Sequence, residues 1–214
     1  MKIKQYLEKI RKPNSKFSLR VKILVSIALI LSGFALGVFQ KWLDSLAVNE
    51  LPYILQAVDV TNFFGRPAVW IFIGTVIAVY ASSSLRAGIN CFLFFISMVS
   101  GYYLYCHFVL GFLPKSYMLI WIVFSFASFF MGYICWYAKG EGIVAIIIAA
   151  GVTGVLFAQA FLFVRGFGVT HILEIITWIC ALFVLRRKWK ETLIVFGLSL
   201  VVSFIYQLVI PYWG

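Results

Sequence analysis

Charged residues are scarce in this chain of 214 residues, where Asp, Glu, Lys and Arg together make up only 12%. An average soluble protein carries about 25% of them. Hydrophobic residues make up 64% of the chain, and its mean hydropathy is +1.03. This composition excludes an ordinary soluble domain, and it excludes a disordered chain because disorder requires low hydrophobicity. The sequence therefore predicts a protein that folds in a lipid bilayer.

Acids are the scarcer of the two charged classes, with 7 Asp and Glu against 18 Lys and Arg and a net charge of +11. In a soluble protein this excess would indicate a nucleic-acid partner. Here the cations flank apolar segments: eight precede the first apolar run, and four more lie within residues 186–190. Cations in such places are orientation signals for membrane insertion. We therefore expect no binding of nucleic acid.

The sequence also lacks closely spaced metal ligands and paired cysteines. Its four cysteines lie far apart inside apolar stretches, at positions 91, 106, 135 and 180, and form no CxxC pair or Cys/His cluster. Zinc sites and disulfide frameworks both need recognisable spacing, so neither is indicated. A free cysteine in such surroundings behaves as a small buried hydrophobe. The sequence predicts no metal, no cofactor and no catalytic residue.

Seven apolar segments have the length of a transmembrane helix, which needs about 20 residues. They are residues 23–39, 67–84, 87–113, 116–138, 142–164, 166–185 and 192–210. Most of the connections between them are very short, which favours a compact antiparallel bundle with little mass outside the membrane. The predicted fold class is an all-α, polytopic transmembrane helix bundle that forms a single domain over residues 23–214. Pro67 suits the first turn of its helix, where a missing backbone donor costs nothing.

The distribution of cations predicts the orientation of the bundle. With a cytoplasmic N-terminus, the inside segments hold 14 of the 18 cations, and only Lys41, Arg66, Lys115 and Arg165 lie outside. This asymmetry is the one that the positive-inside rule expects. Without the sixth span the count would fall to ten inside and eight outside. We therefore expect seven spans, with the N-terminus inside and the C-terminus outside.

Two regions outside the spans have a character of their own. Residues 1–22 carry eight cations and one acid, and they predict a basic cytoplasmic tail on anionic lipid headgroups, where each basic residue contributes about 1 kcal/mol. A specific partner for this tail is the alternative. Residues 41–65, predicted outside, mix acids with aromatic and aliphatic residues. They indicate a short helix in the membrane interface that begins near Pro52, or else a simple polar loop.

Small residues at helical spacing predict where the spans pack together. Gly33 and Gly37 form a GxxxG pair in the first span, and Gly154 lies between two alanines at the same spacing in the fifth. Such residues let helix backbones approach closely in lipid. Asn90 belongs to a stripe of polar and small residues along the third span. It is predicted to face the bundle interior, where it would form hydrogen bonds with a neighbouring helix.

One pair of ionisable residues, His171 and Glu174, lies within a predicted span and shares one helix face. A charge at such a place costs about 2.5–3.5 kcal/mol even on the mildest scale, so it marks a candidate functional site. Arg165 and Arg66 are predicted at the same side of the membrane and would neutralise Glu174. Three interpretations stay open: a structural ion pair, an outward-facing polar pocket for a ligand or ion, and a catalytic acid/base pair. The catalytic one lacks a nucleophile, a metal triad and a second carboxylate.

The segment 66–105, RPAVWIFIGTVIAVYASSSLRAGINCFLFFISMVSGYYLY, is followed by FLPKSY at 112–117 and ICWYAKGEG at 134–142. Together these segments resemble a family of small polytopic bacterial membrane proteins of unknown function. The residues that carry the resemblance are Ser84, Arg86, Phe94, Phe95, Tyr102, Tyr103, Pro114, Lys115, Tyr117, Trp136 and Lys139. The resemblance implies a location in the bacterial plasma membrane, and it implies no activity or site.

Two functions follow as expectations. The first is a non-enzymatic accessory or interaction subunit with a membrane-protein partner, which the scarce intramembrane charge, the small-residue faces and the basic tail favour. The alternative is a small transporter or ligand-binding component of the membrane. Its outward-facing polar site would consist of Glu174, His171, Arg165 and Arg66.

Overall fold

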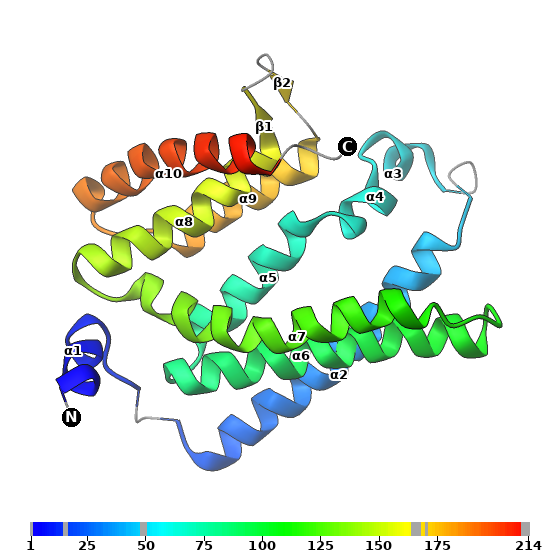
Figure 1. Ribbon diagram of the computed structural model, residues 1–214, viewed down its shortest axis with the longest axis horizontal. Helices are drawn as coiled ribbons and strands as arrows, with labels where there is room; N and C mark the ends of the chain where they lie inside the picture. Colours follow the sequence, from blue (N-terminus) through cyan, green and yellow to red (C-terminus); the bar gives the residue numbers. More distant parts are fainter. Residues whose placement is uncertain (1, 15–16, 48–50, 164–167, 170, 211–214) are drawn as a thin grey trace.

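The computed structural model of the chain, shown in Figure 1, describes residues 2–14, 17–47, 51–163, 168–169 and 171–210. The helices are α1 (Lys2–Ile10), α2 (Leu19–Asp44), α3 (Tyr53–Ala57), α4 (Val60–Gly65), α5 (Pro67–Tyr80), α6 (Ser84–Phe108), α7 (Lys115–Cys135), the 3-10 helix η2 (Trp136–Lys139), α8 (Gly142–Ala160), α9 (Ile172–Val184) and α10 (Trp189–Val209). Strands β1 (Phe161–Leu162) and β2 (Gly168–Val169) form a short antiparallel pair. Apart from this pair, the regular structure of the described residues is helical, as the composition predicts.

Five helices, α2, α6, α7 with η2, α8 and α10, are long and apolar enough to cross a membrane. Helices α5 and α9 have only 14 and 13 residues. At 1.5 Å per residue they extend over about 20 Å, which is less than the hydrocarbon core of about 30 Å. Five of the seven predicted spans are thus helices of spanning length, and the other two are shorter than expected.

The predicted spans 142–164 and 166–185 meet at the β1–β2 pair and not in a simple turn. Gln207 of α10 explains why the chain leaves the helix here: its Nε2 donates to Ala158 O at 3.0 Å, and its Oε1 accepts from Phe163 N at 3.2 Å. A polar side chain that satisfies free backbone groups permits non-helical chain among apolar helices. Helix α9 begins at Ile172, several residues later than predicted.

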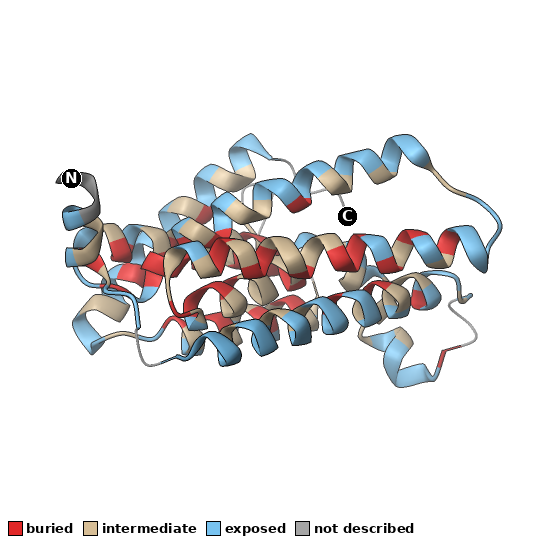
Figure 2. Ribbon diagram, turned by 90° about the horizontal axis from the view of Figure 1, so that it is seen from below, coloured by how far each residue is buried: buried red, intermediate tan, exposed pale blue. Residues whose placement is uncertain are grey.

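The helices form two groups with α5 between them. Helices α2, α6 and α7 pack together, α8 packs against α9 and α10, and α5 contacts α6 and α7 on one side and α8 and α9 on the other (Figure 1). Helices α6 and α8 are central, since 56% of the most apolar stretch of each is buried, against 11–17% in α7, α2 and α10. Figure 2 shows this difference between inner and outer helices. The outer helices therefore present apolar side chains to the surroundings.

Glycines set the closest helix contacts. A Cβ atom on Gly33 or Gly37 of α2 would overlap the carbonyl groups of Phe94 and Met98 in α6, and one on Gly154 of α8 would lie 2.7 Å from Ser199 O in α10. These distances leave no room for a side chain. The small-residue faces noted in the sequence are thus used inside this chain.

Asn90 lies at the same α2–α6 contact and is 4% exposed. Its Oδ1 accepts a hydrogen bond from Ser26 Oγ of α2 at 3.0 Å. Arg86 of α6 also reaches α2, where its Nη2 donates to Lys22 O at 2.6 Å and to Ser26 Oγ at 2.8 Å. These polar contacts supplement the close glycine packing between the two helices.

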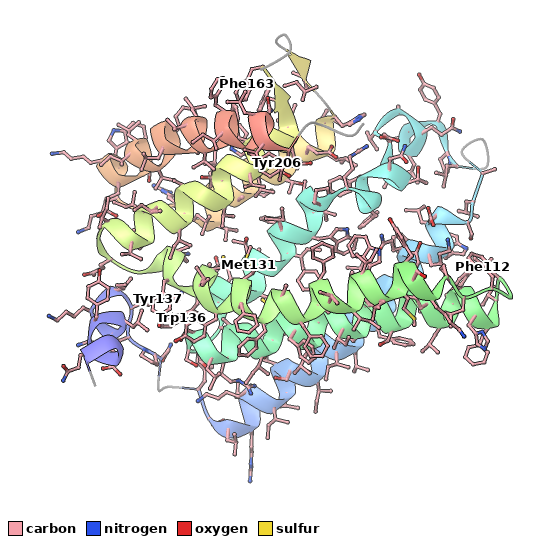
Figure 3. All side chains as sticks on the ribbon, viewed as in Figure 1. Phe112, Met131, Trp136, Tyr137, Phe163 and Tyr206 are labelled. Carbon is pink, nitrogen blue, oxygen red and sulfur yellow. The ribbon has the colours of Figure 1, made fainter. Side chains whose placement is uncertain are left out.

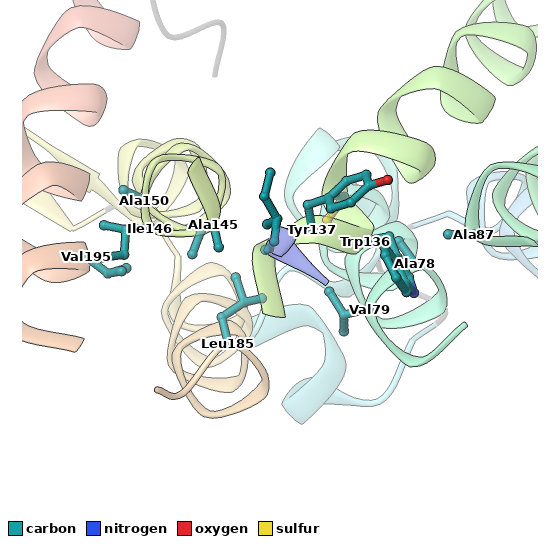
Figure 4. Packing of buried hydrophobic residues seen from close by; sticks show 14 of the residues in the cluster. Ala78, Val79, Ala87, Trp136, Tyr137, Ala145, Ile146, Ala150, Leu185 and Val195 are labelled. Carbon is teal, nitrogen blue, oxygen red and sulfur yellow. The ribbon is translucent and has the colours of Figure 1, made fainter. Parts of the chain in front are cut away.

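The largest cluster of buried apolar residues lies where α5, η2 and α8 meet. Trp136, which is 1% exposed, packs there with Val79 and Ala78 of α5, and the same cluster includes Ala145 of α8 and Leu185 (Figure 4). Trp136 Nε1 donates to Ala81 O at 2.9 Å. The indole thus satisfies a carbonyl just beyond the end of α5, while its ring fills the core.

Two arginines bind the helix ends beside this cluster. Arg11 donates to Trp136 O at 2.5 Å and to Val79 O at 2.8 Å, and its guanidinium lies 4.3 Å from the centre of the Trp136 ring. Arg187 donates to Ala138 O and Gly140 O, each at 2.8 Å. Carbonyls at helix C-termini carry partial negative charge, so cations stabilise them. Burial lowers the pKa of Arg11.

These contacts bring α1, the start of α2 and the turns at 81–84, 139–142 and 185–189 to one end of the bundle, here called the α1 end. The opposite end, which holds α4, is called the α4 end. Helix α1 itself is held by the bundle: Ile10 is 7% exposed, and Glu141 N donates to Ile10 O at 2.7 Å. The lipid contact of the basic tail stays a prediction. The structure adds that the tail has a docked segment at residues 7–11.

Replacing Arg11 with Ala is expected to release α1. The loss removes two charge-assisted hydrogen bonds, each of which contributes about 1.5–3 kcal/mol, and the contact with the Trp136 ring. Hydrogen exchange of the amides at residues 5–10 should accelerate by at least about tenfold. Lys12→Ala, at an exposed neighbouring position, serves as the control. Equal exchange in the two variants would show that Arg11 does not hold α1.

Candidate functional site

Two short helices begin side by side at the α4 end. Helix α4 ends at Gly65, Arg66 is extended with φ −90° and ψ 155°, and Pro67 opens α5. His171 precedes α9 with φ −144° and ψ 150°, and Glu174 lies in the first turn of that helix. An acid in the first turn is favoured by the helix dipole. The break before each helix thus places a charged side chain at the junction of α4, α5 and α9.

Arg66 joins two carboxylates at this junction. Its Nε donates to Glu174 Oε1, and its Nη1 donates to Asp59 Oδ2 at 2.8 Å. Asn62 Nδ2 donates to Asp59 Oδ1 at 2.7 Å, and His171 Nδ1 lies 3.7 Å from Asp59 Oδ2. We refer to Asp59, Asn62, Arg66, His171 and Glu174 as the Arg66 network. It links the consecutive helices α4 and α5 to α9, which follows about 100 residues later in the sequence.

The Arg66 network is buried to different depths. The side chain of Glu174 is 1% exposed and that of Arg66 14%, whereas Asp59 is 26% and His171 35% exposed. A buried carboxylate is tolerated when it is paired and hydrogen-bonded. The guanidinium supplies this pairing for Glu174, while Asp59 and His171 form the more accessible part of the network.

Some polar atoms of the network keep unused hydrogen-bonding capacity. Among the described residues, Arg66 Nη2, Glu174 Oε2 and the nearby Trp178 Nε1 are buried without a hydrogen-bond partner. Each such group costs about 1–3 kcal/mol. A polar ligand that both donates and accepts would satisfy Glu174 Oε2 and Arg66 Nη2, so these atoms are the points of the network at which binding chemistry is possible.

The structure brings together three of the four residues that the sequence proposed for the polar site: Glu174, His171 and Arg66. The fourth, Arg165, lies outside the described residues. The sequence did not point to Asp59. This residue lies within 41–65, which were predicted as a short interfacial helix or a polar loop outside the spans. The fit of Asp59 depends on a local feature, a left-handed backbone with φ 55° just before α4, and no residue pattern indicated it.

A pocket of about 310 Å³ lies beside the network, between α2, α4, α5, α6 and α7. Its lining residues are Gln40, Asp44, Thr61, Phe64, Gly65, Trp70, Met98, Val99, Tyr102, Tyr103, Tyr117 and Trp121. We refer to it as the aromatic pocket. Aromatic residues near the ends of membrane helices normally lie at the membrane interface. No spacing in the sequence indicated that rings from several helices would converge here.

The described residues contain no group of three or more His, Cys, Asp and Glu side chains placed to hold a metal ion. His107, His171 and Glu174, the two histidines of the chain and the most buried acid, do not form such a group.

Several residues of the family-like segments have structural contacts at the α1 end. Ser84 Oγ accepts from Tyr137 at 3.3 Å, and Trp136 forms the centre of the buried cluster. Lys139 Nζ lies 5.0 Å from the centre of the Tyr80 ring.

Compared with protein-family models, curated proteins and solved structures, the chain gives no match, so its function is inferred from its own residues.

Proposed function

We propose that the chain is a seven-helix protein of the bacterial plasma membrane, with the α1 end in the cytoplasm and the C-terminus outside. The bacterial location rests on the family resemblance alone. The gathering of Arg11, Arg86, Lys139 and the 186–190 cluster at the α1 end supports the orientation, because cytoplasmic ends carry the excess of cations.

Within the membrane, the chain acts as a non-enzymatic accessory or interaction subunit. The observation that carries this proposal is the use of Glu174, the most deeply buried carboxylate among the described residues, in an ion pair that joins α5 to α9. This contact gives Glu174 a structural role, since it holds the start of α5 against the first turn of α9. The glycine-containing helix faces are not counted as evidence for a partner protein, because they pack between α2 and α6 and between α8 and α10 of this chain.

The proposal is tested by extraction from the native membrane in mild detergent, followed by native mass spectrometry and by reconstitution alone in lipid vesicles. We expect a membrane protein to co-purify in a fixed ratio, and we expect no saturable solute movement by the purified chain. Saturable transport by the purified chain without a partner would contradict the accessory role.

The second candidate is a transporter or ligand-binding component with its site at the Arg66 network. The specific observation in its favour is that two buried atoms, Arg66 Nη2 and Glu174 Oε2, have no hydrogen-bond partner among the described residues. In this case Glu174→Gln would abolish solute binding or transport while thermal stability and folded yield stay near those of the wild type. A loss of folding without a separable loss of binding would instead indicate a structural ion pair.

A further inference from the structure

The lining of the aromatic pocket has an unusual charge and composition for this protein. Although the chain has a net charge of +11, the residues that line the pocket include one carboxylate, Asp44, and neither Lys nor Arg. Six of the lining residues are aromatic: Phe64, Trp70, Tyr102, Tyr103, Tyr117 and Trp121. The faces of such rings are electron-rich and attract cations. The lining therefore disfavours an anion and favours a positively charged molecule with an apolar body.

Beside the pocket, the ammonium group of Lys41 already contacts Asp44 and two aromatic rings. Lys41 Nζ lies 2.7 Å from Asp44 Oδ2, 5.2 Å from the centre of the Tyr102 ring and 5.8 Å from that of Phe112. Tyr102 also donates to Asp44 Oδ2, at 3.1 Å. Phe112 lies in the connection between α6 and α7, at the far end of these helices in Figure 3. Asp44 and the rings thus already bind an ammonium group, that of Lys41 in the same chain.

A buried hydroxyl in the lining is free to bind a ligand. Tyr103 is 5% exposed, and its hydroxyl has no hydrogen-bond partner among the described residues. Two other polar groups of the lining have partners: Gln40 Nε2 and Trp70 Nε1 both donate to Phe64 O, at 2.9 and 2.8 Å. A buried hydroxyl without a partner is unfavourable. Tyr103 therefore provides a polar contact that a bound molecule would complete.

We propose that the aromatic pocket binds a small hydrophobic organic cation, an ammonium group attached to an apolar or aromatic body. Asp44 supplies the charge, and the rings of Trp70 and Trp121 contact the cation and its body. The Tyr103 hydroxyl binds a further polar atom in those ligands that carry one. The volume of about 310 Å³ is at the small end of ligand pockets, so the ligand has about one ring beside its ammonium group. The proposal goes beyond the accessory role and does not depend on the Arg66 network.

Two probes of nearly the same shape separate charge from apolar contact: benzyltrimethylammonium and its neutral carbon analogue neopentylbenzene. The full-length protein in nanodiscs of zwitterionic lipid is titrated with each probe, and empty nanodiscs correct for partitioning into lipid. Binding is followed by calorimetry and by tryptophan fluorescence, since Trp70 and Trp121 line the pocket. We expect saturable binding of the cation at least about tenfold tighter than that of the neutral analogue, a ratio that corresponds to one strong charge contact.

Variants assign this binding to the pocket. Asp44→Asn should weaken binding of the cation by about tenfold or more, whereas Glu141→Gln, an exposed acid at the α1 end, should leave it unchanged. Lys41→Gln should tighten binding because it removes the ammonium that competes for Asp44. Trp121→Leu should weaken binding without a change of charge.

The proposal is overturned by any of three results. These are equal binding of the two probes, which would indicate a site for neutral lipophiles or acyl chains, equal effects of Asp44→Asn and Glu141→Gln, or no saturable binding of either probe. If Asp44→Asn does not fold, the proposal is tested with Lys41→Gln and Trp121→Leu. The first should raise the affinity for the cation and the second should lower it.

Discussion

Replacing Glu174 with Ala is expected to destabilise the folded protein by about 3–5 kcal/mol, the usual cost of removing one partner from a buried ion pair. The substitution removes the carboxylate that Arg66 Nε binds and leaves the guanidinium, 14% exposed, with Asp59 as its remaining counter-ion among the described residues. The junction of α4, α5 and α9 should open, and thermal unfolding in detergent should shift to a lower temperature.

Controls separate the loss of the charge pair from a general effect of substitution. Glu191→Ala breaks the Arg187–Glu191 pair, whose carboxylate side chain is 34% exposed, and it should cost less than about 1 kcal/mol. The double variant Arg66→Met with Glu174→Leu removes both charges, and it should recover part of the lost stability. An unfolding temperature of Glu174→Ala equal to that of Glu191→Ala would contradict the structural role of the ion pair.

Gly37→Ala should destabilise the contact between α2 and α6 by about 1–3 kcal/mol or more, the range for overpacking of a filled interface. The reason is that the new methyl group would meet backbone atoms of Met98 and Tyr102. Backbone cannot move aside as a flexible side chain can, so the helices must separate along their whole contact, which includes Gly33 and Gly101.

The matched control for this prediction is Gly197→Ala in α10, where nothing lies within 4 Å of the added Cβ. Both substitutions place alanine in an apolar helix, and alanine favours a helix by about 1 kcal/mol over glycine. Thermal unfolding should therefore fall for Gly37→Ala and stay equal or rise for Gly197→Ala. A parallel change in both variants would mean that propensity, and not the close approach to α6, determines the effect at Gly37.

Part of the candidate site was predictable and part was not. The spacing of His171 and Glu174 on one helix face, together with cation counting, indicated that Arg66 would lie near Glu174, and the structure pairs them directly. Asp59 escaped this reasoning because no periodic pattern fixes a residue between two short helices. Arg11 and Arg187 were interpreted only as orientation signals. Their contacts with backbone carbonyls depend on which helix ends meet, and hydropathy carries no information about that.

The sequence by itself determined that this chain is helical and rich in segments that can cross a membrane. The physical reason is that the free energy of transferring a segment into lipid is roughly a sum over its residues. Lipid also offers no hydrogen-bond partners, so the backbone groups of such a segment must pair within a helix. Local chemistry at single residues was equally readable, as at Pro67, which begins α5.

Only the tertiary structure decided how these segments are used. In the folded chain, α5 and α9 are shorter than predicted, and Gln207 contacts the backbone beside the β1–β2 pair. The small-residue faces lie between helices of the same chain. The tertiary structure also brought rings from four helices around Asp44 and Tyr103. These outcomes depend on shape and on the pairing of helix faces, which arise from many residues together and are not a sum over positions.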